Sequence, residues 1–78
     1  MPTMSKFGEK LRALRINARM SQDELGQQLD VSQSYVGRLE RGGSLPNIAL
    51  VLKLVEIFEV SSDELIRDDV ALKNFQSS

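Results

Sequence analysis

The stretch SQSYVGRLERG, from Ser32 to Gly42, carries residue types that could bind a nucleic acid. At helical spacing, Val36 and Leu39 point to one side, with Tyr35 beside them. The other side collects small and polar residues: Gln33, Ser34, Gly37, Arg38 and Arg41. An arginine can donate two hydrogen bonds to guanine O6 and N7, and a glutamine can pair similarly with adenine N6 and N7. The glycine would let the helix approach the bases closely. The pattern therefore fits a helix in the major groove of DNA, with an ordinary solvated helix face as the alternative.

Residues at the helix ends could hold phosphate groups. Gln22 opens a predicted helix, where unpaired backbone N–H groups and the positive end of the helix dipole attract a phosphate oxygen. Arg41 and the backbone of Gly42 and Gly43 could bind a second phosphate. Such contacts would orient the protein on a duplex without selecting a sequence.

The composition argues against catalysis. The 78 residues include no cysteine and no histidine, which removes the usual general base and the commonest metal ligands. There is also no glycine-rich phosphate loop, so we expect no catalytic residue, metal, cofactor or small-molecule ligand. No apolar run approaches the roughly 20 residues needed to cross a bilayer, and nothing resembles a signal peptide. The sequence therefore predicts a non-enzymatic, cytoplasmic protein without membrane contact.

Charge is distributed unevenly along the chain. The formal net charge is only −1, but residues 1–42 carry seven positive and five negative side chains, whereas residues 43–78 carry three and six. One pole could therefore face phosphate while the other is repelled by it. An ordinary solvated surface would give the same numbers, so charge alone does not decide the question.

The elements that must position these residues are predicted to be five helices. The first, over about residues 5–18, follows from apolar residues at helical spacing: Phe7, Leu11, Leu14 and Ala18. Ser21 with Glu24 forms a capping-box pattern that would start the second helix. Leu25 and Leu29 give that helix its apolar side.

The third helix is bounded by clear signals. Ser32 can cap it, and Gly42 is placed to end it. Val31 and Val36 can form a hydrophobic staple at its start. A fourth helix is expected over about residues 47–58, and a second capping box, SSDE, opens a short fifth helix. No alternating strand pattern appears, so the predicted fold class is all-α.

The second and third helices are joined by a very short connection at Asp30 and Val31. Such a connection forces the two helices to cross closely, which requires a small side chain at the contact. Gly26 lies one turn before the bend and meets this requirement. Asp30 lies where the chain needs a left-handed residue, a conformation that Asp tolerates better than most. These features predict a helix-turn-helix unit.

On these residues the sequence resembles the helix-turn-helix family of lambdoid phage repressors and Cro proteins, restriction–modification controller proteins and related bacterial transcription regulators. The matching segments, within about residues 7–66, are SQDELGQQLDVSQSYVGRLERG, Pro46 and LVLKLVEIFEVSSDELI. Two positions depart from the family pattern: Gly26 where alanine is common, and Asp30 where glycine is common. The resemblance implies a five-helix domain of the lambda-repressor type. It also implies a bacterial or phage-encoded, nucleoid-associated protein.

The resemblance assigns DNA contacts to single residues. Gln33, Ser34 and Arg38 fall on the positions that contact bases in this family. Gln22 and Ser32 fall on positions that hold phosphates. The partner implied is double-stranded DNA.

The resemblance also implies an ion pair within the fold. In the resembling repressors, an arginine of the first helix pairs with a glutamate near the end of the third, and Arg15 and Glu40 match these positions. Arg15 is therefore expected to support the fold. A DNA contact by Arg15 is the alternative.

The fourth helix is apolar over most of its surface. Residues 48–58 cover an arc of roughly 220° on a helical wheel, whereas a helix on a small core needs little more than about 100°. We expect the core side to consist of Ile48, Val51, Leu52 and Val55. The surplus is expected to form a dimer interface with the tail: Leu50, Leu54, Ile57 and Phe75. The alternative is a central helix covered entirely by its own chain.

These features predict a helix-turn-helix domain over residues 1–69 and a tail over 70–78 that could add dimer contacts. The expected function is a transcriptional regulator, either a repressor or a controller protein. It would bind a palindromic operator as a homodimer, with residues 33–41 in the major groove. A protein-interaction module, such as an antitoxin with little operator readout, is the alternative. Aromatic residues make up only 5% of the chain, which argues against stacking on single strands.

Overall fold

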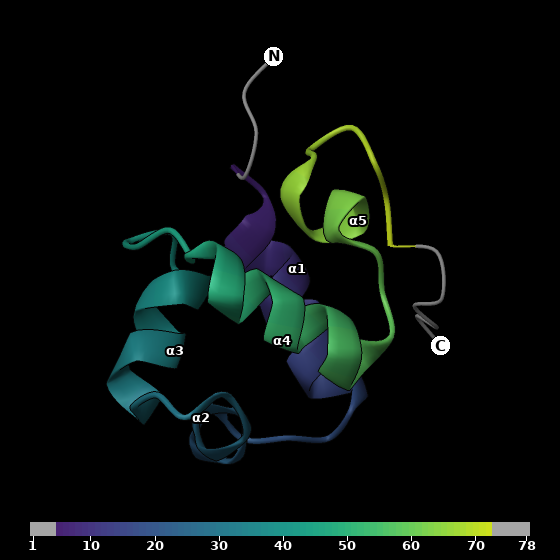
Figure 1. Ribbon diagram of the computed structural model, residues 1–78. Coiled ribbons are helices and arrows are strands. Elements are labelled where there is room, and N and C mark those ends of the chain that lie inside the picture. The colour runs from purple at the N-terminus through teal and green to yellow at the C-terminus, as the bar shows by residue number, and fades with distance from the viewer. Residues whose placement is uncertain (1–4, 73–78) are drawn as a thin grey trace.

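Five helices make up the regular structure of residues 5–72, the part of the chain that the computed structural model describes (Figure 1). They are α1 (Phe7–Asn17), α2 (Gln22–Leu29), α3 (Gln33–Glu40), α4 (Ile48–Phe58) and α5 (Ser62–Ile66). In Figure 1, α4 runs across the middle of the view, with α3 at the left, α2 at the bottom and α5 at the upper right. The predicted all-α class and the order of the helices are confirmed. Within residues 5–72, no helix is long and apolar enough to span a membrane.

Local side-chain caps start four of these helices. The Ser21 hydroxyl accepts a hydrogen bond from the Glu24 backbone N–H, and the Glu24 carboxylate accepts one from the Ser21 N–H. Ser61 and Glu64 repeat this arrangement at the start of α5. The serine before α3 and the asparagine before α4 each accept one backbone N–H. Both predicted capping boxes are therefore present, and each satisfies two donors that a helix start leaves unpaired.

The turn between α2 and α3 has the geometry that the sequence predicts. Asp30 adopts a left-handed conformation, with φ 61° and ψ 42°. A Cβ atom at Gly26 would lie 2.8 Å from the carbonyl oxygen of Val31, so only glycine allows the chain to turn this tightly. Val36 is buried and Val31 packs against the core, as expected for the staple. This rigid turn fixes the position of α3 relative to α2.

The core combines apolar side chains from all five helices and the loop before α5. Its buried members are Phe7, Leu11, Leu14, Leu25, Leu29, Val36, Leu39, Leu50, Val51, Leu54, Val60 and Leu65. Ala18, which was expected to continue the apolar side of α1, is exposed because the helix ends at Asn17.

The orientation predicted for α4 is wrong in large part. Leu50 and Leu54 are buried in the core, whereas Ile48 and Leu52 are 68% and 55% exposed. The helix is apolar almost all the way round, so periodicity could not select the buried side, and contacts with α2 and α5 decide it instead. Leu50 and Leu54 therefore cannot form a surface for a second copy.

Ile57 and Phe75 are the other two residues predicted to lie in the dimer interface. Ile57 is only partly buried and packs against the core of its own chain. Phe75 lies outside the described residues. Leu45, 69% exposed in the loop before α4, adds to the apolar surface that Ile48 and Leu52 form.

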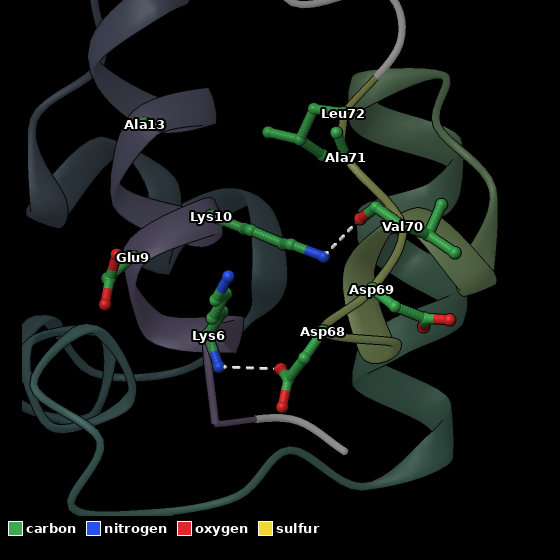
Figure 2. Close-up of a pocket in the computed structure, with 9 residues that line it drawn as sticks. All are labelled: Lys6, Glu9, Lys10, Ala13, Asp68, Asp69, Val70, Ala71 and Leu72. Atoms are coloured by element: carbon green, nitrogen blue, oxygen red, sulfur yellow. Dashed lines mark hydrogen bonds between the residues drawn. The ribbon is translucent and has the colours of Figure 1, made fainter. Parts of the chain in front are cut away.

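Two side chains tie α1 to the segment after α5. The Lys10 ammonium donates hydrogen bonds of 2.7 Å to the carbonyl oxygens of Glu64, Arg67 and Val70. Figure 2 shows Lys10 extending from α1 toward Val70. These carbonyls lie in or just beyond α5, so Lys10 acts as a cap supplied by a different helix.

The reciprocal contact comes from Asp68. Its carboxylate accepts a hydrogen bond from the Lys6 backbone N–H at 2.9 Å (Figure 2). It also accepts one from the Ser5 hydroxyl at 2.5 Å. The residue before α1 makes no side-chain cap of its own. Asp68 therefore supplies the missing N-terminal cap of α1.

The described part of the predicted tail, residues 70–72, belongs to the same packed unit. The Val70 carbonyl accepts the bond from Lys10, and Leu72 packs against the core. The expected boundary after residue 69 therefore does not coincide with a break in packing.

Candidate nucleic-acid interface

The outer side of α3 presents the polar residues expected to contact bases. Gln33, Ser34 and Arg38 are exposed, whereas Val36 and Leu39 are fully buried beneath them. The helix is thus anchored by its apolar side and leaves its polar side open to a ligand.

Arg38 is braced by an aromatic ring. Its guanidinium carbon lies 5.5 Å from the centroid of the Tyr35 ring, and Tyr35 itself packs against the core. Such a contact holds the arginine by cation–π attraction and restricts its conformations. The sequence interpretation missed this pair, although residues three apart on a helix are neighbours and the spacing could have indicated it.

At the start of α3, Ser32 performs a structural task. Its hydroxyl oxygen accepts a hydrogen bond of 3.1 Å from the Tyr35 backbone N–H and so caps the helix. The hydroxyl proton is still a donor, because capping uses only the oxygen. The Ser32 hydroxyl can therefore cap α3 with its oxygen and donate its proton to a phosphate at the same time.

The end of α3 differs from the expectation for the glycines. The N–H of Gly42 donates to the Leu39 carbonyl, and the N–H of Gly43 donates to the Arg38 carbonyl at 2.8 Å. With Gly42 at φ 81°, this is a Schellman ending. Both amides are occupied in closing the helix, so the exposed Arg41 side chain is the donor left for a phosphate here.

The Arg15–Glu40 ion pair is present. Arg15 Nε lies 2.6 Å from Glu40 Oε2, and the exposed fractions of the two side chains are 12% and 3%. A second bond joins Arg15 Nη2 to Glu40 Oε1, and Arg15 Nη1 donates to the Met20 carbonyl. The hydrogen bonds to Glu40 raise the pKa of Arg15. Arg15 therefore fixes α1 to the end of α3 and does not face outward.

Gln22, the first residue of α2, contacts this pair. Its amide nitrogen donates a hydrogen bond of 3.1 Å to Glu40 Oε1. Gln22 is half-buried, unlike the exposed residues Gln33, Ser34 and Arg38 of α3. This bond links an expected phosphate-binding residue to the interior ion pair, and the sequence interpretation did not foresee it.

Gly37 is placed differently from the expectation. It is buried, not open to an approaching duplex, because other side chains cover it. A Cβ atom at Gly37 would lie 3.0 Å from Arg41 Nη1 and 3.5 Å from Gln22 Oε1. The glycine thus makes room for these two side chains rather than for bases.

Two exposed arginines, Arg38 and Arg41, lie at the end of α3. The carboxylates near α5 have cations beside them, because Asp69 pairs with Arg67 at 3.0 Å and Asp68 interacts with Lys10. Figure 1 shows α3 and α5 on opposite sides of the structure. The two arginines at the end of α3 would attract an approaching polyanion.

Comparisons with known proteins agree on the family. A model of the helix-turn-helix family, described as "Helix-turn-helix", matches residues 11–65. The HTH-type transcriptional regulator YazB of Bacillus subtilis is 32% identical over 59 residues, covering 76% of this chain and 86% of its own. The transcriptional activator BcrR of Enterococcus faecalis is 34% identical over 78% of this chain, which spans only 30% of BcrR.

Solved structures give the same result. The P22 c2 repressor in complex with a synthetic operator has a TM-score of 0.71 and 32% identity, covering 76% of this chain and 89% of its own. The restriction–modification controller protein C.AhdI of Aeromonas hydrophila has a TM-score of 0.70 and 35% identity, covering 80% and 94%. Both are of the kinds that the sequence resembles, so the predicted lambda-repressor-like fold is confirmed. The chain belongs to the helix-turn-helix family and is a DNA-binding transcriptional regulator.

Proposed function

We propose that this regulator binds a specific double-stranded operator by placing α3 in the major groove. The exposed side of α3, with Gln33, Ser34 and Arg38 above a buried apolar side, is the observation that carries the proposal. Arg38 is suited to a guanine and Gln33 to an adenine, because each can make two hydrogen bonds to that base. The likeness to the P22 c2 repressor, which was solved on a synthetic operator, supports this arrangement.

Phosphate contacts would flank the base contacts. Gln22 at the start of α2 and Ser32 at the start of α3 lie at positive helix ends, where phosphate binding is favourable. Arg41 would neutralise a phosphate at the other end of α3. These contacts would fix the register of α3 on the duplex.

Homodimer formation would place two copies of α3 on one operator. Ile48 and Leu52 lie four residues apart on the same side of α4, and together with Leu45 they expose a cluster of large apolar side chains. A second copy related by two-fold symmetry would cover this cluster. The operator would then be an inverted repeat with half-site centres about 34 Å, or roughly 10 base pairs, apart.

The test is selection of duplexes from a random pool, followed by sequencing and by sedimentation with and without the selected site. We expect a dimer and an inverted repeat. Leu52→Asp should run as a monomer and lose most specific affinity, whereas Gln28→Ala, a change at an exposed polar position of a different helix, α2, should behave as the parent. A monomeric parent that binds a non-repeated site would overturn the dimer. A parent that enriches no sequence would favour the protein-interaction alternative.

A further inference from the structure

We infer that Glu40 positions the Gln22 amide for phosphate binding, so that the buried ion pair contributes to DNA affinity as well as to the fold. This inference rests on the proposed function and adds a residue that never touches DNA. Its basis is the chain of contacts from Arg15 through Glu40 to Gln22.

The first step is the fixed position of the carboxylate. Glu40 accepts two hydrogen bonds from Arg15, at 2.6 Å to Oε2 and 3.1 Å to Oε1. A guanidinium that binds both oxygens sets the plane and direction of the carboxylate. With a side chain only 3% exposed, Glu40 has no other orientation open to it inside the fold.

The second step is the orientation of the amide. Glu40 Oε1 also accepts the bond from Gln22 Nε2, and an ionised carboxylate can only accept. A flipped amide would set its oxygen against the carboxylate oxygen, which is repulsive. Glu40 therefore selects the orientation with nitrogen toward it. An amide nitrogen carries two donors, and among the described contacts only one is used, so the other is available to a phosphate.

The third step is the room beside Gly37. A Cβ at this position would lie 3.0 Å from Arg41 Nη1, 3.5 Å from Gln22 Oε1 and 3.7 Å from Gln22 Nε2. The two side chains come from different helices but meet over the same residue of α3. One phosphate could therefore contact both, with the amide already ordered before DNA arrives. Ordering a flexible side chain in advance removes a cost that binding would otherwise include.

A double-mutant cycle on the selected operator tests the inference. One background is the parent, and the other is Arg15→Met with Glu40→Leu, which replaces the ion pair with apolar side chains of similar size. In the parent, Gln22→Ala should raise Kd on the order of tenfold on every duplex. In the apolar background the same change should raise Kd less than about twofold, because Gln22 is already unordered. Circular dichroism checks that both backgrounds remain helical.

Gly37→Ala is an independent test, which can still be made if the apolar background does not fold. Alanine favours a helix over glycine, and only the end of the flexible Arg41 side chain must shift, because the Gln22 amide lies at ordinary van der Waals distance from the added methyl group. This variant should therefore melt no lower than the parent, yet its Kd should rise several-fold because the methyl group shifts Arg41 and narrows the space where the Arg41 and Gln22 side chains meet. If these contacts only stabilise the fold, the melting temperature should fall whenever Kd rises.

The possible failures are distinguishable. An equal effect of Gln22→Ala in both backgrounds would overturn positioning by Glu40 and leave the proposed function intact. Parent-like affinity of Gly37→Ala would overturn the shared phosphate contact of Gln22 and Arg41 beside this residue and also leave the proposed function intact. A parent protein that binds no duplex specifically would instead overturn the proposed function, and this inference with it.

Discussion

The α2–α3 turn and the junction between α1 and the segment after α5 are stabilised over very different sequence distances. In this α2–α3 region, each cap joins residues three apart: Ser21 with Glu24 at the start of α2, and Ser32 with Tyr35 at the turn. At the junction, the bonds of Lys10 and Asp68 join residues 54 to 63 positions apart. The first region is defined by its own local sequence, whereas the second exists only once the whole domain has folded.

The difference bears on function. The α2–α3 region, which we propose to face DNA, is capped by local signals and is joined to α1 by one buried ion pair. The helix ends at the junction have no adequate caps of their own, and each is completed by the other segment. Damage to the junction should therefore lower stability first and affinity only through unfolding.

The largest effect expected in the domain comes from the core side of α4. Leu50 is only 5% exposed, so Leu50→Asp would bury an unpaired charge and cost about 4 kcal/mol or more, enough to unfold much of a small domain. At protein concentrations where the parent is monomeric, Leu52→Asp, two residues away but exposed, should change the free energy of unfolding by about 0.5 kcal/mol or less. Thermal melts of the two variants measure this. Equal destabilisation would contradict the orientation of α4.

A smaller loss is expected at the junction. Lys10→Met keeps the aliphatic stem but removes three donors to carbonyl oxygens, which should cost about 1–3 kcal/mol. For a domain of this size, each kcal/mol lowers the melting temperature by about 4–8 °C. Lys6→Met is the matched control, since the Lys6 contact to Asp68 uses its backbone N–H. Equal melting temperatures for the two variants would show that Lys10 does not cap α5 and that this long-range contact does not stabilise the junction.

The smallest effect is the pH dependence at Asp68. Hydrogen bonds from the Ser5 hydroxyl, and then from the Lys6 and Ser5 backbone N–H groups, lower the pKa of this carboxyl. A lowered pKa in the folded state stabilises the fold above the unfolded-state pKa of about 3.9, and this stabilisation is lost as the pH falls through the lower folded-state value. Asp68→Asn should therefore melt below the parent at neutral pH, and the gap should close in acid. A gap that is constant with pH would rule out the charged cap.

Features made by short-range contacts could be predicted from the sequence, whereas features made by long-range contacts could not. Caps, the left-handed turn residue and the polar side of α3 are short-range features, and each was predicted at the residue where it occurs. The ion pair joins two helices, and only the family resemblance indicated it. Motif spacing thus located the helix caps and the exposed polar side of α3, on which the proposed site depends.

Tertiary contacts account for the errors. Nothing in the pattern of α4 distinguishes Leu50 from Leu52, because both sides of the helix are apolar and only its neighbours determine which is covered. Gly37 is covered by side chains from two helices, and Gly43 is closed by a backbone bond, neither of which periodicity represents. The Lys10 and Asp68 contacts require knowing that the two ends of the chain meet.

Duplex selection with the parent and with Arg38→Ala, followed by sequencing, tests most directly whether the outer side of α3 recognises bases. We expect Arg38→Ala to lose about 1–3 kcal/mol of binding free energy on the parent's site and to lose the preference at one base pair in each half-site. Gln22→Ala, which removes a proposed phosphate contact, should bind more weakly but select the parent's sequence. An unchanged consensus for Arg38→Ala would contradict the assignment of α3 as the recognition helix.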